Sequence, residues 1–85
     1  MYYVYVLISD DGCHYTGKTS DMQRRLQDHN AGHNESTRGK KWHLVYYEAY
    51  TSKEDAHRRE MRLKDGRAKK ELFKRIDKSL QIFMV

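Results

Sequence analysis

The first apolar stretch of the chain does not alternate between polar and apolar positions. Residues 2–8, YYVYVLI, are apolar at both odd and even positions and are rich in tyrosine and β-branched side chains. This composition predicts a strand that is covered on both faces. The polar turn that follows, SDDG at residues 9–12, predicts a hairpin, since Gly12 can adopt positive φ. Residues 13–18 are then the second strand of that hairpin.

The residues after the hairpin follow a helical period instead. One face of the predicted helix carries residues at spacings of three, four and seven: Met22, Arg25, Leu26 and His29. We expect Ser20 to be the N-cap, with Gln23 three residues later completing a capping box. The helix should end near Asn30, where Gly32 is available to stop it.

A polar segment, AGHNESTRGKK at residues 31–41, separates this helix from the next apolar run. It predicts a loop that is long for so small a domain, and such loops often bind something. Residues 42–50, WHLVYYEAY, predict a third strand. The third strand is therefore expected to follow the loop directly.

Two further helices are predicted after the third strand. Thr51 or Ser52 should cap the first, with Glu54 or Asp55 as its reciprocal partner. Its inward stripe is Ala56, Glu60 and Leu63, and Gly66 should end it. The second should cover about residues 67–79 and bury Leu72, Phe73 and Ile76, and Leu80 is a further candidate for burial.

The resulting order is β-β-α-β-α-α. Three short strands with helices against them predict an α+β fold, in which a small three-stranded antiparallel sheet is flanked by helices. A chain of 85 residues is expected to form one domain, residues 1–85. No basic segment followed by an apolar one begins the chain, and Cys13 is its one cysteine, so a cytoplasmic protein is expected.

Charge changes this picture in the C-terminal part. The net charge is +5, and residues 53–85 hold eleven Lys or Arg against six Asp or Glu, whereas residues 1–52 hold six of each. Interleaved Glu and Lys are also typical of ordinary helix surfaces. A basic helix at residues 67–79 nevertheless fits a nucleic-acid footprint, for which we single out Lys69, Lys70 and Lys74.

Glu60 and Arg25 are the side chains that fit their predicted surroundings least. A carboxylate in an apolar stripe costs free energy unless it is paired or bound to a metal ion. A salt bridge from Glu60 to Arg59, Lys64 or a strand residue would satisfy it, and so would a metal ion. Arg25 could pair with a carboxylate in the same way, including Glu60. His29 fits either a packed or a catalytic histidine.

Together these residues resemble a known family. The segments VYV at 4–6, YTG at 15–17, Lys18, Arg25, His29-Asn30 and Glu60 are similar to the GIY-YIG nuclease domain, most of all to its short stand-alone bacterial branch. The likeness covers roughly residues 1–65. Tyr3 and Thr16 stand where the family motif has glycine and isoleucine, and His29 stands where the excision-repair nucleases have tyrosine.

The resemblance implies metal-dependent hydrolysis of a DNA phosphodiester. On the matching positions, Glu60 would hold one Mg²⁺ or Mn²⁺ and Arg25 would bind the phosphate. Tyr5 is the favoured general base, with His29 as the rival, and Lys18 is expected to lower the pKa of a phenol. Further roles are implied for Tyr15, Gly17 and Asn30: positioning the phosphate or water, allowing close approach of the backbone, and supporting the site.

Two functions therefore stand at this point. One is an endonuclease in DNA repair or recombination, acting on branched, damaged or single-stranded DNA. The other is a module of the same fold that binds nucleic acid or recruits repair proteins without useful turnover. The sequence leaves open whether RNA is also a substrate, and whether the protein works as a homodimer or with a repair partner.

Overall fold

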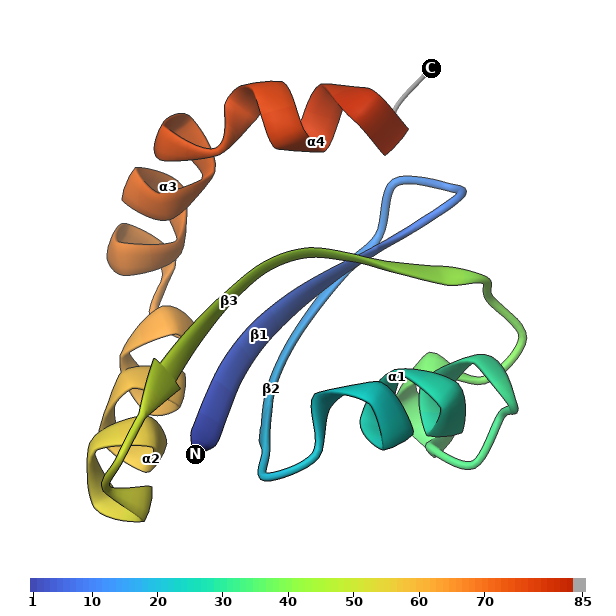
Figure 1. The fold of residues 1–85 in the computed structure, drawn as a ribbon. Coiled ribbons are helices and arrows are strands. Elements are labelled where there is room, and N and C mark those ends of the chain that lie inside the picture. The colour runs from blue at the N-terminus through green and yellow to red at the C-terminus, as the bar shows by residue number, and fades with distance from the viewer. Residues whose placement is uncertain (84–85) are drawn as a thin grey trace.

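The computed structural model describes residues 1–83 and shows three strands and four α-helices (Figure 1). The chain runs in this order: β1 (Tyr2–Ser9), β2 (His14–Thr19), α1 (Met22–Asn30), a short 3₁₀ helix (Glu35–Thr37), β3 (Trp42–Tyr50), α2 (Lys53–Leu63), α3 (Gly66–Arg75) and α4 (Asp77–Phe83). The predicted α+β class is confirmed, and β3 has the predicted bounds.

The three strands form one antiparallel sheet in the order β2-β1-β3. Tyr5 is paired with Gly17 of β2 and with Tyr47 of β3. Because β1 is the central strand, β2 is an edge strand, and its residues are available to a site at the margin of the sheet. A register shift between Val6 and Leu7 marks an irregularity opposite β3.

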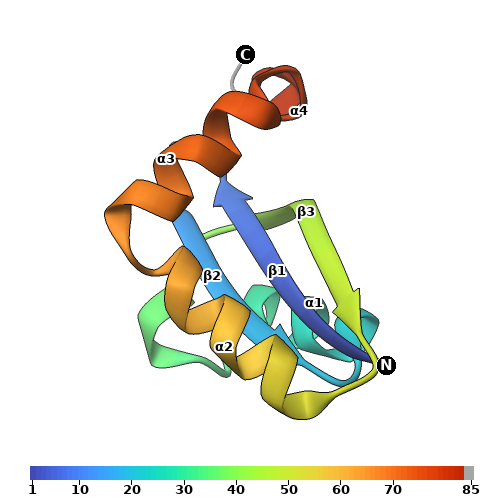
Figure 2. The ribbon, with the colours of Figure 1, turned by 90° about the vertical axis from the view of Figure 1, so that its left-hand side faces the viewer.

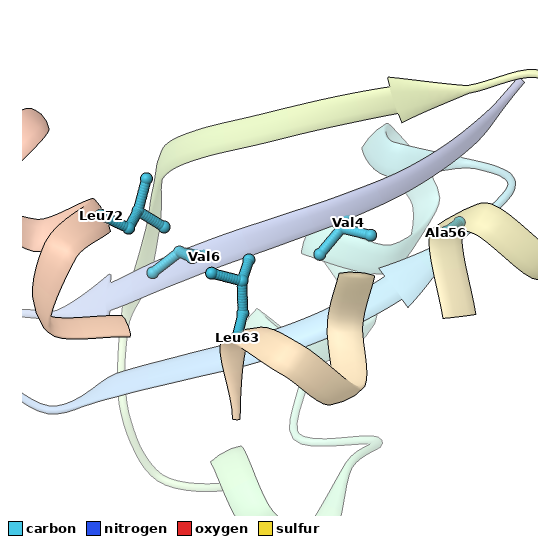
Figure 3. Packing of buried hydrophobic residues seen from close by; sticks show 5 residues of the cluster. All are labelled: Val4, Val6, Ala56, Leu63 and Leu72. Carbon is cyan, nitrogen blue, oxygen red and sulfur yellow. The ribbon is translucent and has the colours of Figure 1, made fainter. Parts of the chain in front are cut away.

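Helices cover the sheet on both faces, as the unalternating pattern of β1 predicts. Helix α2 lies on one side of the sheet and α1 on the other, as the two orthogonal views show (Figure 2). Val4 and Val6 point to the α2 and α3 side, where they pack with a small cluster of helix residues (Figure 3): Ala56, Leu63 and Leu72. Tyr5, Leu7 and Trp42 form a second cluster on the opposite face.

The start of α1 differs from the prediction. Asp21, not Ser20, is the N-cap, and its side chain accepts a hydrogen bond from the Arg24 backbone N–H. Thr19 accepts from the Asp21 backbone N–H at 3.1 Å, which holds the cap residue in place. The predicted cap of α2 is confirmed, since the Ser52 side chain accepts from the Asp55 backbone N–H.

The C-terminal part is divided differently from the prediction. Helix α2 ends at Leu63, and Gly66 begins α3 rather than ending α2. The expected helix over residues 67–79 is two helices, because the backbone at Ile76 leaves helical geometry with φ −110° and ψ 24°. This turn brings α4 onto β3, where the Phe83 ring stacks on His43 with ring centroids 4.8 Å apart. Residues 84–85 lie outside the described residues.

Candidate active site at the edge strand

The close pairing of Tyr5 with Gly17 creates the site. A Cβ atom at Gly17 would lie 2.5 Å from the Tyr5 hydroxyl oxygen and 2.6 Å from Tyr5 Cζ. The phenol therefore lies directly over the glycine Cα, and its hydroxyl reaches β2, the edge strand. Only glycine lets the ring approach the backbone this closely.

Helix α1 brings two side chains to that hydroxyl. The Tyr5 hydroxyl and His29 Nε2 are 2.8 Å apart, and Arg25 Nε donates to the Tyr5 oxygen at 3.3 Å. Arg25 and His29 are separated by one helical turn, so the predicted shared face of α1 positions both. The structure thus joins three of the predicted site residues in one hydrogen-bonded group.

Tyr15 completes this group on the same face of the sheet. Its ring centroid is 4.8 Å from that of His29 and 6.3 Å from that of Tyr5. Tyr15 is half-buried, whereas Tyr5 is fully buried at 0% exposure. Tyr15 is therefore the more accessible of the two phenols.

Burial sets the protonation of this group. It is the main cause that raises the pKa of Tyr5 to about 12, and the hydrogen bond from Arg25 only partly opposes it. Burial, followed by the positive charge of Arg25, lowers the pKa of His29 below its ordinary value. At neutral pH Tyr5 is therefore protonated and His29 is neutral.

Lys18 does not lower a phenol pKa as expected from the sequence. It is paired with Val4 across β1 and β2 and so shares the face of the sheet opposite to Tyr5. Its Nζ contacts Nδ1 of His57, a residue of α2. The pKa of Tyr5 is raised rather than lowered, and the hydrogen-bonded cation at the phenol is Arg25.

Glu60 is buried in the predicted stripe of α2, with 7% of its surface exposed. Its ion pair is with Lys64, one helical turn later, at 3.5 Å. The expected alternatives are not formed in the described part of the chain: Arg25 donates to Tyr5, and Arg59 pairs with Glu48 at 3.0 Å. Lys64, one of the three partners named from the sequence, is the one that the structure selects.

Glu60 and the Tyr5 group approach the edge strand from opposite faces. Helix α2 packs on the Val4 side, whereas the phenol crosses Gly17 on the other side. The negative charge of Glu60 is nevertheless the smallest of several causes that raise the pKa of Tyr5, after burial and the neighbouring Tyr15. The carboxylate and the phenol therefore interact electrostatically, although weakly.

Asn30 ties this site to the sheet. Its side-chain Nδ2 donates to the Trp42 carbonyl oxygen at 3.2 Å, and its Oδ1 accepts from the Trp42 backbone N–H at 2.7 Å. The end of α1 is therefore clamped to the start of β3, which keeps His29 at a fixed distance from Tyr5.

Thr37 is a member of the site that sequence reasoning missed. Its hydroxyl oxygen is 2.8 Å from His29 Nδ1, and the residue is 0% exposed. It lies in the polar segment that predicts a loop, where no hydrophobic period marks a buried position. The short helix at Glu35–Thr37 is what turns its side chain inward.

Glu60 is the residue that could hold a divalent cation. Among residues 1–83 there is no group of three or more His, Cys, Asp or Glu side chains that could bind a metal ion. A single buried carboxylate fits a Mg²⁺ ion that keeps most of its water and takes further oxygen ligands from a phosphate. The donor set is therefore compatible with one hard cation that substrate helps to bind.

The basic residues expected to contact substrate lie around a separate groove. An open groove of about 600 Å³ at α3 is lined by three cations, Lys69, Lys70 and Lys74, together with His14, Gly66, Phe73 and one acid, Asp77. His14 begins β2, the edge strand that also carries Gly17.

In the described part of the chain no helix is both long enough and apolar enough to span a membrane.

Comparison with known proteins agrees with the fold. Residues 1–74 match the GIY-YIG catalytic domain, so the chain belongs to the GIY-YIG family, a family of nucleases. Nucleases of this family generally use a divalent metal ion, and a nuclease domain implies a DNA substrate. The resemblance seen in the sequence is confirmed.

Within that family the chain is similar to small proteins named UPF0213. It is 47% identical over 74 residues to a UPF0213 protein of Halobacterium salinarum, covering 84% of this chain and 96% of the relative. A UPF0213 protein of Bacillus pumilus is 40% identical over 75 residues, covering 85% and 76%. The solution NMR structure of the UPF0213 protein BH0048 from Bacillus halodurans has a TM-score of 0.55 at 40% identity, covering 87% of this chain and 84% of that one.

Proposed function

We propose that this protein is a metal-dependent DNA endonuclease that hydrolyses phosphodiester bonds in DNA repair or recombination. The observation that carries the proposal is the group of Tyr5, Arg25 and His29 at the edge strand, with the buried carboxylate of Glu60 on the other side of that strand. A polyanion at this margin would meet a cation, a proton acceptor and a metal ligand together.

Arg25 is suited to bind the scissile phosphate. It is half-buried and, in the part of the chain that the structure describes, its guanidinium pairs with no carboxylate. The hydrogen bond from Nε to Tyr5 leaves the terminal guanidinium nitrogens to make a two-point contact with phosphate oxygens. The same cation would stabilise the charge that grows in the transition state.

Tyr5 and His29 are suited to move a proton together. A phenol with a pKa of about 12 is a poor base on its own near neutral pH. His29, whose pKa is lowered, is neutral and can accept a proton from the phenol at 2.8 Å. We therefore assign proton removal from the attacking water to this pair rather than to either residue alone, with Tyr15 positioning the water or the phosphate.

Glu60 would hold Mg²⁺ or Mn²⁺, which offsets negative charge on the phosphate and the leaving oxygen. In the structure Lys64 Nζ lies 3.5 Å from a carboxylate oxygen of Glu60 and neutralises it, so Glu60 is not an isolated buried charge. The half-exposed Lys64 side chain can swing away when a cation arrives. The Glu60 carboxylate can therefore interact either with Lys64 or with a metal ion.

Branched, damaged or single-stranded DNA is the proposed substrate class, with the lysines of α3 binding the backbone beyond the site. We expect nicking of a panel of flaps, forks, junctions and single strands with Mg²⁺ or Mn²⁺, and none with EDTA. Arg25→Ala should abolish cleavage, whereas Arg24→Ala, its exposed neighbour on α1, should leave it intact. Binding without cleavage of any substrate would instead identify a recruitment or binding module.

A further inference from the structure

Thr37 is buried at a point where three segments of the chain meet: α1, the 3₁₀ helix with its cap, and the start of β3. Its hydroxyl lies against His29, its carbonyl oxygen accepts from the Trp42 indole Nε1 at 2.8 Å, and its backbone N–H donates to the Asn34 carbonyl at 3.1 Å. The Asn34 side chain in turn caps the 3₁₀ helix by accepting from the Ser36 backbone N–H. The side chain of Thr37 is therefore held in one place.

The direction of the hydrogen bonds through Thr37 follows from proton counting. A threonine hydroxyl has one proton, and Thr37 donates it to the Asn34 carbonyl oxygen at 3.3 Å. The Thr37 oxygen is then an acceptor for His29 Nδ1 at 2.8 Å, which must carry the N–H. A neutral imidazole has only one N–H, so His29 Nε2 presents a lone pair.

That lone pair faces the Tyr5 hydroxyl. Arg25 Nε already donates to the Tyr5 oxygen, so the phenol proton is free to point at His29 Nε2, 2.8 Å away. In the opposite tautomer His29 would donate to Tyr5, and the buried phenol proton would lose this acceptor. One arrangement of protons satisfies every hydrogen bond in the series that runs from Arg25 through Tyr5, His29 and Thr37 to the Asn34 carbonyl oxygen.

We propose that Thr37 is a positioning residue, which fixes the Nδ1–H tautomer of His29 so that Nε2 accepts the proton of Tyr5. The inference rests on the proposed nuclease function for its catalytic consequence, but the tautomer itself does not depend on that function. It also gives the polar segment at residues 31–41 a role: it folds inward to orient a histidine of α1.

The tautomer is measured directly by long-range ¹H–¹⁵N NMR of the full chain at pH 7.5. We expect the His29 Nδ1 shift of a protonated nitrogen and the Nε2 shift of an unprotonated one. Thr37→Val, which keeps the shape and removes the hydroxyl, should shift the population toward Nε2–H, and Thr37→Ser should restore the wild-type pattern. A predominantly Nε2–H imidazole in the wild type overturns the inference.

Cleavage kinetics test the consequence. Thr37→Val should lower kcat by about 10–100-fold, as removal of a supporting hydrogen bond commonly does, with little change in KM. Thr37→Ser should be within a few-fold of the wild type, and the exposed neighbour Ser36→Ala should be unaffected. Equal activity of Thr37→Val and wild type would contradict the role of Thr37.

The two tests separate this inference from the proposed function. If the wild type cuts no substrate, the nuclease proposal fails, and the NMR result alone then decides whether Thr37 sets the tautomer. If Thr37→Val does not fold, the serine variant and the wild-type shifts still decide: Nδ1–H in both supports the inference, and Nε2–H in either contradicts it.

Discussion

Replacing Gly17 with alanine perturbs the centre of the site by a single methyl group. The new Cβ would lie 2.5 Å from the Tyr5 hydroxyl oxygen and 2.9 Å from Tyr15 Cε1. Ordinary non-bonded contacts between carbon atoms are about 3.5–4.0 Å, so the Tyr5 ring must move by about 1 Å. The ring cannot swing into solvent, because Tyr5 is fully buried and its hydroxyl is held by His29 and Arg25.

The expected cost is that of overpacking a core, about 1–3 kcal/mol of unfolding free energy. For a domain of this size, each kcal/mol lowers Tm by about 4–8 °C. Cleavage should fall more steeply than stability, because a shift of about 1 Å in the phenol breaks its 2.8 Å hydrogen bond with His29. The assay is a thermal melt together with single-turnover cleavage of an end-labelled DNA substrate.

Gly66 supplies a matched control. It begins α3, its φ is not positive, and a Cβ there would meet nothing within 4 Å. Gly66→Ala should therefore melt at or slightly above the wild-type temperature, because alanine reduces the entropy of the unfolded chain. If Gly17→Ala melts within about 2 °C of Gly66→Ala, the close approach of Tyr5 to the edge strand is refuted.

The charged and titratable groups lead to three further predictions. The cleavage rate should rise with pH through the pKa of His29, which lies below its ordinary value of 6.5, and should be flat above about pH 7. A rate that continues to rise above about pH 8 would instead indicate that the Tyr5 phenolate acts without His29. Glu48→Gln should lower stability by about 1–2 kcal/mol and leave cleavage intact, because the ion pair with Arg59 lies away from the site; unchanged chemical denaturation would contradict this. Changing Lys69, Lys70 and Lys74 to glutamine should weaken the salt dependence of DNA affinity. The slope of log affinity against log salt concentration should fall in magnitude by about 0.9 for each phosphate that is no longer neutralised, and an unchanged slope would show that these lysines do not contact the DNA backbone.

Glu48 also makes stability depend on pH in the acid range. Burial opposes its ionisation, but hydrogen bonds from Tyr46, Tyr50 and Arg59 lower its pKa below 4.5. The folded state then binds fewer protons than the unfolded state, so this contribution is present above pH 4.5 and disappears as pH falls through the folded pKa. A Glu48→Gln variant should show a smaller decrease in stability on acidification.

Hydrophobic patterning predicted the parts of the fold that depend on periodic burial. The bounds of β3 and the buried stripe of α2 follow from strand and helix periods, which packing then enforces. The shared face of Arg25 and His29 follows from the same period. These features required only local spacing.

The features that were missed depend on contacts between distant segments or on competition between neighbours. Ser20 and Asp21 are adjacent residues that both favour an N-cap, and the hydrogen bond that Thr19 accepts from the Asp21 backbone N–H favours Asp21. The break at Ile76 has no glycine or proline to mark it, and it places α4 on β3, far from it in sequence. Thr37 is polar in a polar segment, so only the tertiary fold shows that it is buried.

The sequence named Lys64 among the partners of Glu60 but could not choose between them, for a similar reason. Helical spacing allowed Lys64 at i,i+4, while Arg25 was plausible only if both residues shared one face of the sheet. Successive side chains of β1 point to opposite faces of the sheet, and α1 and α2 cover these two faces. Arg25 and Glu60 are therefore kept apart. The resemblance supplied the roles, whereas the structure supplied their geometry.

Single-turnover cleavage by Glu60→Gln, compared with Glu54→Gln, tests the central claim most directly. Both variants neutralise one glutamate of α2, but Glu60 is buried beside the edge strand and Glu54 is exposed in the first turn. We predict that Glu60→Gln folds and binds DNA yet does not cut it with Mg²⁺ or Mn²⁺, while Glu54→Gln cuts like the wild type. A folded Glu60→Gln protein that cuts at the wild-type rate would contradict the assignment of Glu60 as metal ligand and the nuclease mechanism built on it.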